Sequence, residues 1–407
     1  MKPLRVAIDC RVEDPRQGIW TAVEALAYGL SSLQRTDQTY TFIVPEHLVE
    51  LLRSHISGSC SILSIASPET PSRSYNLARE LTRKFKVVRK MADVVRSTQI
   101  NVPQSDGTVE RNVFDLVHFP TQVAYLTNLP SIYQPWDLQH IHYPQFFARR
   151  DILIREKQYR AFCDQASIIA VQTEWGKQDL IRHFGIEERK VRVVRWGSVF
   201  EASSPVSEED IQNTQRDLNL PSKFVVFPAA TWQHKNHELV IRSLAQSKVA
   251  EQQLHVVFTG AVTEYKKNLL DVAKQLGIQD RVQFVGFVSP KQLKAIFHTA
   301  IAMVFPSKFE GLGLPVLEAF HAGLPVICSN ATVLPEVVGD AALLFDSDSP
   351  EELASLLCRV LESPELRAHM IERGQQMLSS NTIFQTAERF ADLYDEIARK
   401  SIAKARQ

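Results

Sequence analysis

Short runs of β-branched and aromatic residues alternate with longer stretches of helical periodicity along the whole chain. In the first half these runs are LRVAID, YTFIV, LVHF, SIIAVQ and VRVVRW, and in the second half they are FVVFPA, LHVVFTG, VQFVG, AMVFP and PVICS. Runs with so few polar residues are typical of strands buried on both faces, which occur in parallel sheets covered by helices. Two such series predict an α/β protein with two domains.

A polar segment marks the boundary between the two series. Residues 198–207 (SVFEASSPVS) follow Trp196 and Gly197 and contain Pro205, a composition typical of a linker. We therefore expect a first domain over residues 1–197 and a second over 198–385, followed by a C-terminal helix over 386–407. At ~100–200 residues per domain, a chain of 407 residues accommodates this division.

Composition excludes several classes of protein. Lys and Arg together number 46, as do Asp and Glu, so no overall charge favours binding to nucleic acid. The five cysteines lie far apart with no C-x-x-C pair, which argues against a disulfide framework and a thiolate zinc site and favours a reducing compartment. The first residues, MKPLRVAIDC, carry Arg5 within their apolar stretch, and no apolar run approaches the ~20 residues of a spanning helix. We expect a cytoplasmic protein.

The segment from Phe305 to Asp346 (FPSKFEGLGLPVLEAFHAGLPVICSNATVLPEVVGDAALLFD) carries the clearest functional signal. A strand is followed by a loop with Gly311 and Gly313 and then by a helix, and a glycine-containing turn of this kind favours phosphate binding. Glu310 precedes the loop and Glu318 lies one turn into the helix. A carboxylate can accept hydrogen bonds from both hydroxyls of a vicinal diol, so two carboxylates beside a phosphate site predict a nucleotide sugar. The alternative is an ordinary helix N-terminus with favourable acidic residues nearby.

The same segment resembles the signature of retaining family-4 glycosyltransferases (glycosyl transferases group 1), which have the GT-B fold. The matching parts are FEGLGLPVLEA, GLPVI and LPEVVGDAA, with Glu310 and Glu318 at the spacing of the family's glutamate pair. The resemblance extends over nearly the whole chain, through PAATWQHKNH near 228–237, VQFVGFVS near 282–289 and WDLQHIHYPQFF near 136–147. It implies two Rossmann-like domains that face each other across a cleft, with the C-terminal helix crossing back to the N-terminal domain.

The resemblance assigns most of the donor site to the second domain. Glu318 would hold the ribose hydroxyls, Glu310 would face hydroxyls of the donor sugar, and Lys235 would pair with the diphosphate. His118 resembles the histidine over the donor sugar, so the expected catalytic residues are Glu310, His118 and Lys235. The remaining donor contacts would come from Gly18, Phe287, Val288, Gly311, Leu312, Gly313 and Leu314.

Two departures from the family pattern concern the diphosphate and the acceptor. Residues 229–231 (AAT) stand where the family often has an arginine, which leaves the charge on the diphosphate to Lys235 and to helix dipoles. Asp137 resembles the aspartate of the family's H-D-L pattern and would lie on the acceptor side, but Trp136 replaces the histidine before it.

Taken with the resemblance, these residues predict a hexosyltransferase that moves mannose or glucose from a nucleotide-diphosphate sugar to a hydroxyl group with retention of configuration. The W-x-HKNH and YPQFF segments favour GDP-mannose, with UDP-glucose next. The acceptor would be a glycan or a lipid-linked saccharide of cell-surface glycan or polysaccharide synthesis, and the reaction would need no metal ion and no cofactor. The alternatives are a sugar-nucleotide epimerase or glycan phosphorylase of the same architecture, and a non-catalytic nucleotide-sugar-binding protein.

Three further patterns each allow two interpretations. Residues 73–96 are rich in Lys and Arg and have apolar residues at helical spacing, which is typical of a helix on the inner face of an anionic membrane or of a helix packed by its apolar side. His140 and His142 alternate as two metal ligands on a strand do, but no third ligand has a convincing spacing, so we predict no metal site. Residues 346–348 (DSD) form a D-x-D sequence, which we interpret as helix capping rather than as a metal site.

Overall fold

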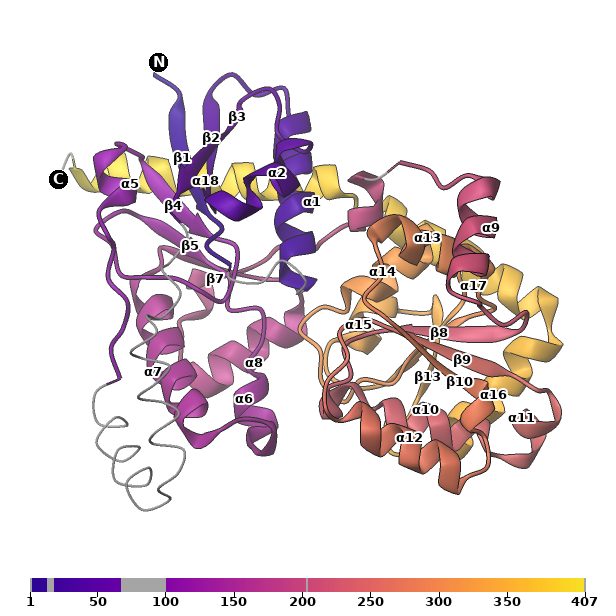
Figure 1. Cartoon of the computed structure of the whole chain (residues 1–407). Helices are drawn as coiled ribbons and strands as arrows, with labels where there is room; N and C mark the ends of the chain where they lie inside the picture. The colour runs from indigo at the N-terminus through magenta and orange to yellow at the C-terminus, as the bar shows by residue number, and fades with distance from the viewer. Residues whose placement is uncertain (1, 13–17, 67–99, 203, 406–407) are drawn as a thin grey trace. The chain divides into compact units, whose positions relative to one another are not determined.

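The computed structural model describes residues 2–12, 18–66, 100–202 and 204–405 (Figure 1). The predicted basic segment 73–96 lies outside these residues. Contacts divide the chain into two compact units. The first comprises the described residues up to Val171, Lys177–Val194 and the chain from Ala387 onwards, and the second comprises Gln172–Gly176 and Arg195–Thr386.

Within the described residues, the first unit has a seven-stranded parallel sheet with the order β3-β2-β1-β4-β5-β6-β7. Its strands are β1 (Leu4–Asp9), β2 (Gln38–Pro45), β3 (Cys60–Ile65), β4 (Leu116–Phe119), β5 (Ser131–Tyr133), β6 (Ile168–Val171) and β7 (Val191–Val193). Its helices are α1 (Gly18–Ser32), η1 (Glu46–Leu48), α2 (Val49–Arg53), α5 (Thr108–Arg111), α6 (Gln139–His142), η2 (Pro144–Phe146), α7 (Arg149–Gln165), α8 (Glu174–Phe184, which begins in the second unit) and η3 (Glu188–Lys190).

The described part of the second unit has a six-stranded parallel sheet with the order β10-β9-β8-β11-β12-β13. Its strands are β8 (Phe224–Pro228), β9 (His255–Thr259), β10 (Val282–Gly286), β11 (Met303–Phe305), β12 (Val326–Ser329) and β13 (Ala342–Phe345). Its helices are η4 (Val199–Ala202), α9 (Glu208–Asp217), η5 (Gln233–Lys235), α10 (His237–Leu244), α11 (Ser247–Glu251), α12 (Lys266–Gln275), η6 (Gln279–Arg281), α13 (Pro290–Thr299), α14 (Leu314–His321), α15 (Leu334–Val338), α16 (Pro350–Glu362) and α17 (Pro364–Ser379).

The last helix, α18 (Ile383–Ala405, yellow in Figure 1), begins in the second unit and continues in the first. In the first unit, hydrogen bonds connect α18 to two strands, β2 and β4. Gln38 of β2 donates from Nε2 to the carbonyl of Ala391 at 3.0 Å, and the hydroxyl of Tyr394 lies 2.8 Å from a ring nitrogen of His118 on β4. The carboxylate of Asp395 pairs with Arg35 at 2.7 Å. These contacts make α18 part of the first unit's core.

All the strands predicted from apolar runs are present, and the two parallel-sheet units confirm the expected α/β class. The structure adds β3, β5 and β13, which the sequence analysis did not single out. Strands β3 and β13 are the outer strands of their sheets and their burial is incomplete, and β5 has only three residues. Short or half-exposed strands lack the continuous apolar run that identifies a central strand.

Two helices of the second unit begin with a serine cap. Ser289 caps α13 in a reciprocal capping box with Gln292, and the side chain of Ser349 accepts a hydrogen bond from the N–H of Glu352 at the start of α16. In the core of the second unit, the buried ring of Phe227 packs edge to face against the rings of Phe258 and Phe305. Among the described residues, no helix has the length and apolar character needed to cross a bilayer.

Candidate functional site

The strand order of the second sheet reverses between β8 and β11. From β8 the chain adds β9 and β10 on one side and then crosses to the other side, where β11, β12 and β13 follow. Because β8 and β11 are parallel neighbours, their carboxyl ends lie side by side at one edge of the sheet. Open α/β sheets bind ligands at such a switch point. Lys235 ends η5 after β8, and Glu310 lies in the loop after β11, so the topology brings both predicted residues to this edge.

An ion pair joins these two loops. The Nζ atom of Lys235 lies 2.6 Å from Oε1 of Glu310, and the two side chains are 21% and 11% exposed. The same ammonium group lies 5.9 Å from the centroid of the Phe305 ring. The carboxylate occupies one of the three N–H donors of the lysine, which leaves the others to donate to an anion. The pair therefore holds a cation in a fixed position at the switch point.

The loop between β11 and α14 offers backbone donors beside this pair. Gly313 has left-handed backbone angles (φ 81°, ψ 46°), and α14 begins at the next residue. Among the described residues, no acceptor receives the N–H groups of Gly311, Leu312 or Gly313, although the side chain of Leu312 is buried. Amides that lack partners at the positive end of a helix dipole favour an anion. The predicted phosphate loop thus has the backbone geometry that its sequence indicated.

Glu318 lies on α14 with its side chain buried. Within the described part of the chain, its carboxyl group has no hydrogen-bond donor, and burial raises its pKa from 4.5 to about 7. A buried carboxyl group without a partner destabilises a fold. Strongly shifted carboxyl groups beside an anion site are typical of functional residues.

Two residues that the sequence analysis did not assign hold these loops in place. Asn236 donates from Nδ2 to the carbonyls of Pro306 and Ser347, at 3.2 and 2.7 Å. The hydroxyl of Thr332 accepts from the N–H of Glu310 at 3.2 Å and donates to the carbonyl of Glu310 at 3.1 Å. Both residues have left-handed φ values, 62° and 50°, which residues other than glycine and asparagine adopt rarely and which recur at functional sites. The sequence carried one signal for them, the position of Asn236 within HKNH.

Comparisons with known proteins identify the class of this chain. Residues 208–377 match the family described as glycosyl transferases group 1. A D-inositol 3-phosphate glycosyltransferase of Corynebacterium glutamicum is 27% identical over 318 residues, which cover 72% of this chain and 75% of the relative. The chain is a glycosyltransferase with a group 1 domain. A second relative of the same description is aligned over only 58% of its length. The O-antigen chain mannosyltransferase B of Escherichia coli is 23% identical over 370 residues, 87% of this chain and 93% of that protein.

A solved structure identifies the fold of this glycosyltransferase. The Anabaena protein HepE, in complex with UDP-glucose, matches with a TM-score of 0.70 at 18% sequence identity, over 97% of this chain and 100% of HepE. Together with the two parallel sheets, this likeness confirms the expected GT-B fold with its two Rossmann-like units.

The predicted base-binding segment follows β10 in the second unit of the glycosyltransferase. Phe287 is 59% exposed, whereas Val288 is buried. The strands are parallel, so β10 ends at the same edge of the sheet as β8. Trp232, after β8, is 55% exposed and was not predicted. Exposed aromatic rings at a ligand-binding edge can pack on a base or a sugar, and the placement of these residues is compatible with that role.

Gly18 and Asp137 belong to the first unit. Gly18 is the exposed first residue of α1. The carboxylate of Asp137 accepts the N–H of Gln139 at 3.0 Å, at the start of α6, and the side-chain amide of Gln122 at 3.3 Å. The preceding Trp136 has a left-handed φ of 65°. The roles of Gly18 and Asp137 towards a ligand stay predictions.

The placement of His118 does not fit the predicted role over the donor sugar. The side chain is fully buried at the carboxyl end of β4, and its ring nitrogens lie 2.8 Å from Gln134 Oε1 and 2.8 Å from the hydroxyl of Tyr394. Burial lowers the pKa of His118 to about 3. A neutral ring with both nitrogens occupied and no exposed surface cannot contact a sugar in this conformation. The geometry instead makes His118 a connection between β4 and α18.

A buried polar cluster at the carboxyl end of β1 was missed by the sequence analysis. The carboxylate of Asp9 accepts from the hydroxyl of Tyr125 at 2.7 Å and lies 3.2 Å from Nε of Arg11, which also pairs with Asp106 at 2.8 Å. Burial raises the pKa of Asp9 to about 6, although Arg11 opposes this shift. In the first sheet the strand order reverses between β1 and β4, so this cluster lies at the equivalent switch point. The position of Asp9 at the end of LRVAID was the available signal.

The structure also shows the surroundings of the two sequence patterns that were considered as metal sites, His140 with His142 and residues 346–348. His140 and His142 lie on the single-turn helix α6 rather than on a strand, so the alternation that suggested two ligands on one face does not apply. In residues 346–348, the carboxylate of Asp348 pairs with Lys308 at 2.5 Å, and the carbonyl of Asp346 accepts the N–H of the capping residue Ser349. The side chain that caps α16 is that of Ser349, so a capping role for the carboxylates of residues 346–348 stays a prediction.

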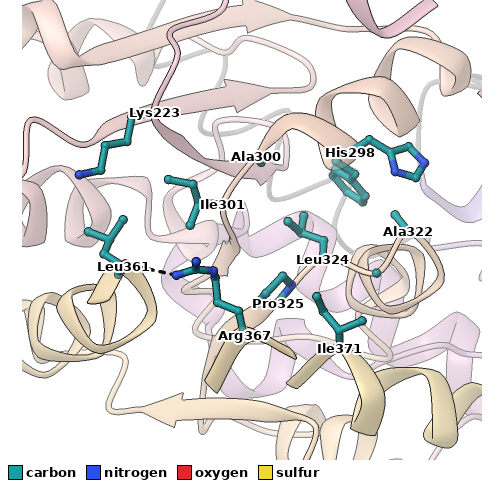
Figure 2. Close-up of a pocket in the computed structure, with 12 residues that line it drawn as sticks. Lys223, His298, Ala300, Ile301, Ala322, Leu324, Pro325, Leu361, Arg367 and Ile371 are labelled. Carbon is teal, nitrogen blue, oxygen red and sulfur yellow. Dashed lines mark hydrogen bonds between the residues drawn. The ribbon is translucent and has the colours of Figure 1, made fainter. Parts of the chain in front are cut away.

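A pocket of about 390 Å³ lies at the opposite edge of the second sheet (Figure 2). Its lining includes Lys223, Ile301 and Pro325, which precede β8, β11 and β12, and Arg367 of α17, which donates to the carbonyl of Leu361 at 3.2 Å. The predicted donor site lies at the other ends of these strands. This pocket is therefore not the predicted donor site.

Proposed function

We propose that the chain is a retaining family-4 glycosyltransferase that moves a hexose from a nucleotide-diphosphate sugar to a hydroxyl acceptor. The observation that carries this proposal is the Lys235–Glu310 pair at the switch point, next to the amides of Gly311, Leu312 and Gly313, which have no acceptor among the described residues. These groups supply a fixed positive charge and several N–H donors in one place, which suits a diphosphate. The buried carboxyl group of Glu318, to which no described residue donates a hydrogen bond, suits the ribose hydroxyls.

Charge development at the leaving group explains why the reaction needs these residues. As the bond between the anomeric carbon and the diphosphate oxygen breaks, positive charge grows on the sugar and negative charge on the diphosphate. Lys235 and the N-terminus of α14 stabilise the diphosphate at that moment because they are already in position. Glu310, held at its backbone by Thr332, keeps Lys235 aligned and accepts hydrogen bonds from hydroxyls of the donor sugar.

Retention follows when the acceptor attacks from the face that the diphosphate leaves. The acceptor oxygen bonds to the anomeric carbon, the bond to the diphosphate oxygen breaks, and the hydroxyl proton passes to an oxygen of the departing diphosphate. The products are the glycosylated acceptor and a nucleoside diphosphate, so atoms and charge balance. This route requires neither a metal ion nor a cofactor, because Lys235 and the helix dipole supply the positive charge, and it does not require the closely spaced carboxylate pair of a retaining hydrolase.

The donor is a mannose-type or glucose-type sugar nucleotide. The similarity to an O-antigen chain mannosyltransferase along 87% of the chain supports GDP-mannose, and the fold shared with HepE, which was solved with UDP-glucose, supports UDP-glucose as the second choice. The acceptor is a hydroxyl of a glycan or lipid-linked saccharide in cell-surface glycan or polysaccharide synthesis. A cytoplasmic enzyme that meets a lipid-linked acceptor at the inner face of the membrane would use residues 73–96, and liposome flotation with charge reversal at Arg83, Lys84 and Lys86 tests this contact.

Calorimetric titration of the full chain with GDP-mannose, UDP-glucose and ADP-glucose tests the donor site. We expect one of these donors to bind, with the affinity strongly reduced in Lys235→Met. Lys291→Met is the matched control, because Lys291 also forms an ion pair in the second unit, with Asp210 at 2.7 Å, but is mostly exposed. Failure of every donor and of free UDP, GDP and ADP to bind would overturn the proposal.

The configuration of the product tests the mechanism separately. Nuclear magnetic resonance of the anomeric proton should show the donor's configuration in the product. An inverted product would exclude the retaining route while leaving the donor site intact. Turnover without an acceptor would favour an epimerase, and binding without any turnover would favour a non-catalytic nucleotide-sugar-binding protein.

A further inference from the structure

Three potential metal ligands converge in the first unit. They are His142 at the end of α6, and Asp179 and His183 on α8. The Nε2 atom of His142 lies 2.8 Å from Oδ1 of Asp179, and Nε2 of His183 lies 3.4 Å from the same oxygen. One ligand atom from each residue lies within 4.8 Å of the other two.

The backbone explains this convergence. Asp179 and His183 are four positions apart on α8, so their side chains lie on the same face of the helix. The rings of His142 and His183 are nearly perpendicular, at 81° with centroids 5.2 Å apart, which lets both Nε2 atoms approach one point without stacking of the rings. Asp179 is only 6% exposed, whereas the histidines are 27% and 30% exposed. The carboxylate is therefore fixed and the two rings have room to adjust.

These distances are close to those of a metal complex. Two ligand atoms at about 2.0–2.1 Å from a tetrahedral zinc ion lie about 3.3 Å apart. The two contacts of the Asp179 oxygen, 2.8 and 3.4 Å, lie on either side of that value. The third separation, between the two imidazole nitrogens, is within 4.8 Å, so binding would require the two partly exposed rings to move towards one point.

We propose that His142, Asp179 and His183 bind a divalent transition-metal ion of the zinc class. Two imidazole nitrogens and one carboxylate oxygen suit such an ion, and three protein ligands leave a coordination position for water. The proposal replaces the sequence-based prediction of no metal site. It concerns the first unit alone and takes no part in the proposed transfer step, so failure of the metal site leaves the donor chemistry untouched.

The metal ion would stabilise the segment that carries the predicted acceptor residue. Asp137 accepts the N–H of Gln139 at the first residue of α6, and His142 is the last residue of the same turn. A metal ion shared by His142 and the two ligands on α8 would hold the C-terminal end of α6 against α8. This link would add to the hydrogen bond between His142 and Asp179. The site therefore acts as a clamp between α6 and α8.

The test uses the tag-free full-length protein, treated with a chelator and then titrated calorimetrically with ZnCl₂. We expect one zinc ion per chain. Replacing a residue that only hydrogen-bonds to a metal ligand lowers metal affinity by about 10–100-fold. His142→Gln and His183→Gln each remove a ligand and should weaken zinc binding by more than this. Cobalt(II) added in place of zinc should give the visible absorption of a tetrahedral complex, and both variants should lose this absorption. His47→Gln, an exposed histidine on η1, is the matched control and should bind like the unaltered protein.

Two results would overturn the proposal. Zinc binding of equal affinity in the unaltered protein and in both histidine variants would place the ion elsewhere. No stoichiometric binding by the unaltered protein would mean that Asp179 only accepts hydrogen bonds from the two histidines. Both histidines are partly exposed, so their glutamine variants should fold, and melting curves with and without zinc verify this. Zinc should raise the melting temperature of the unaltered protein alone, because a ligand that binds only the folded state stabilises it.

Discussion

Replacing Lys235 with methionine separates two roles of the ion pair at the switch point. At 2.6 Å between Nζ and Oε1 and an effective dielectric constant of about 20, the gross attraction is about 6 kcal/mol. Desolvation of the two ions, several kcal/mol each, offsets most of it. The variant leaves Glu310, 11% exposed, without its cation. Leaving a buried polar group unsatisfied costs about 1–3 kcal/mol, and removing one partner of a buried ion pair costs about 3–5 kcal/mol. Because Glu310 is not fully buried, we expect the free energy of unfolding to fall by about 2–3 kcal/mol, where these ranges meet.

Thermal unfolding and turnover measure the two roles independently. One kcal/mol shifts the melting temperature of a unit of this size by about 2–4 °C, so the second unit of Lys235→Met should melt about 4–12 °C lower. In Lys235→Met/Glu310→Gln no unpaired carboxylate remains, so most of the melting temperature should return. Transfer should fall by about 10²–10³-fold in kcat in both variants, because the stabilising charge is absent from both.

A double variant that regains both stability and turnover would show that Lys235 has only a structural role. Sugar transfer at the normal rate by Lys235→Met would likewise exclude a role of its charge in the reaction. The control Lys291→Met should change neither property, because its exposed pair with Asp210 contributes little.

Three further predictions concern single residues. The pKa of Glu318 rises from 4.5 in the unfolded chain to about 7 in the folded one, so folding favours the protonated form and stability falls as the pH rises from 4.5 to 7. In Glu318→Gln, the decrease in the free energy of unfolding with rising pH should be smaller by roughly 3 kcal/mol, measured by denaturant unfolding at pH 5 and pH 8. The variant should also bind the donor more weakly. Tyr394→Phe leaves one nitrogen of His118 without its partner and should cost about 1–3 kcal/mol; unchanged stability in urea would contradict the connection between β4 and α18. Gly313→Ala should lower both stability and donor affinity, because φ is 81° there and a Cβ would lie 3.0 Å from Leu334 Cδ2; calorimetry with normal affinity would speak against the loop geometry.

The sequence predicted the central strands because strands buried on both faces are apolar along their whole length. It failed for β3, an outer strand whose apolar run is interrupted by Ser61 and Ser64, and for β5, whose three residues lie between Pro130 and Gln134. In the site, Lys235 and Glu310 were predicted separately. Their ion pair joins residues 75 positions apart, and no local pattern encodes such a contact.

The roles of two histidines could not be predicted from their neighbours in sequence either. His118 stands at the end of a predicted strand, where a ligand contact is common, but Tyr394 of the last helix and Gln134 occupy both of its nitrogens. His142 was considered with its neighbour His140, whereas its partner in the structure is Asp179, 37 positions further along the chain. Local spacing cannot reveal a partner that another helix supplies.

The order of apolar runs and glycines in this chain was sufficient to determine its class and the loop that precedes α14, because these features depend on burial and on backbone preferences within a few residues. The tertiary structure alone decided which charges meet. Side chains at the ends of different strands and helices come together only after the sheets form. Only then is Lys235 paired with Glu310, Glu318 buried and His118 enclosed between β4 and α18.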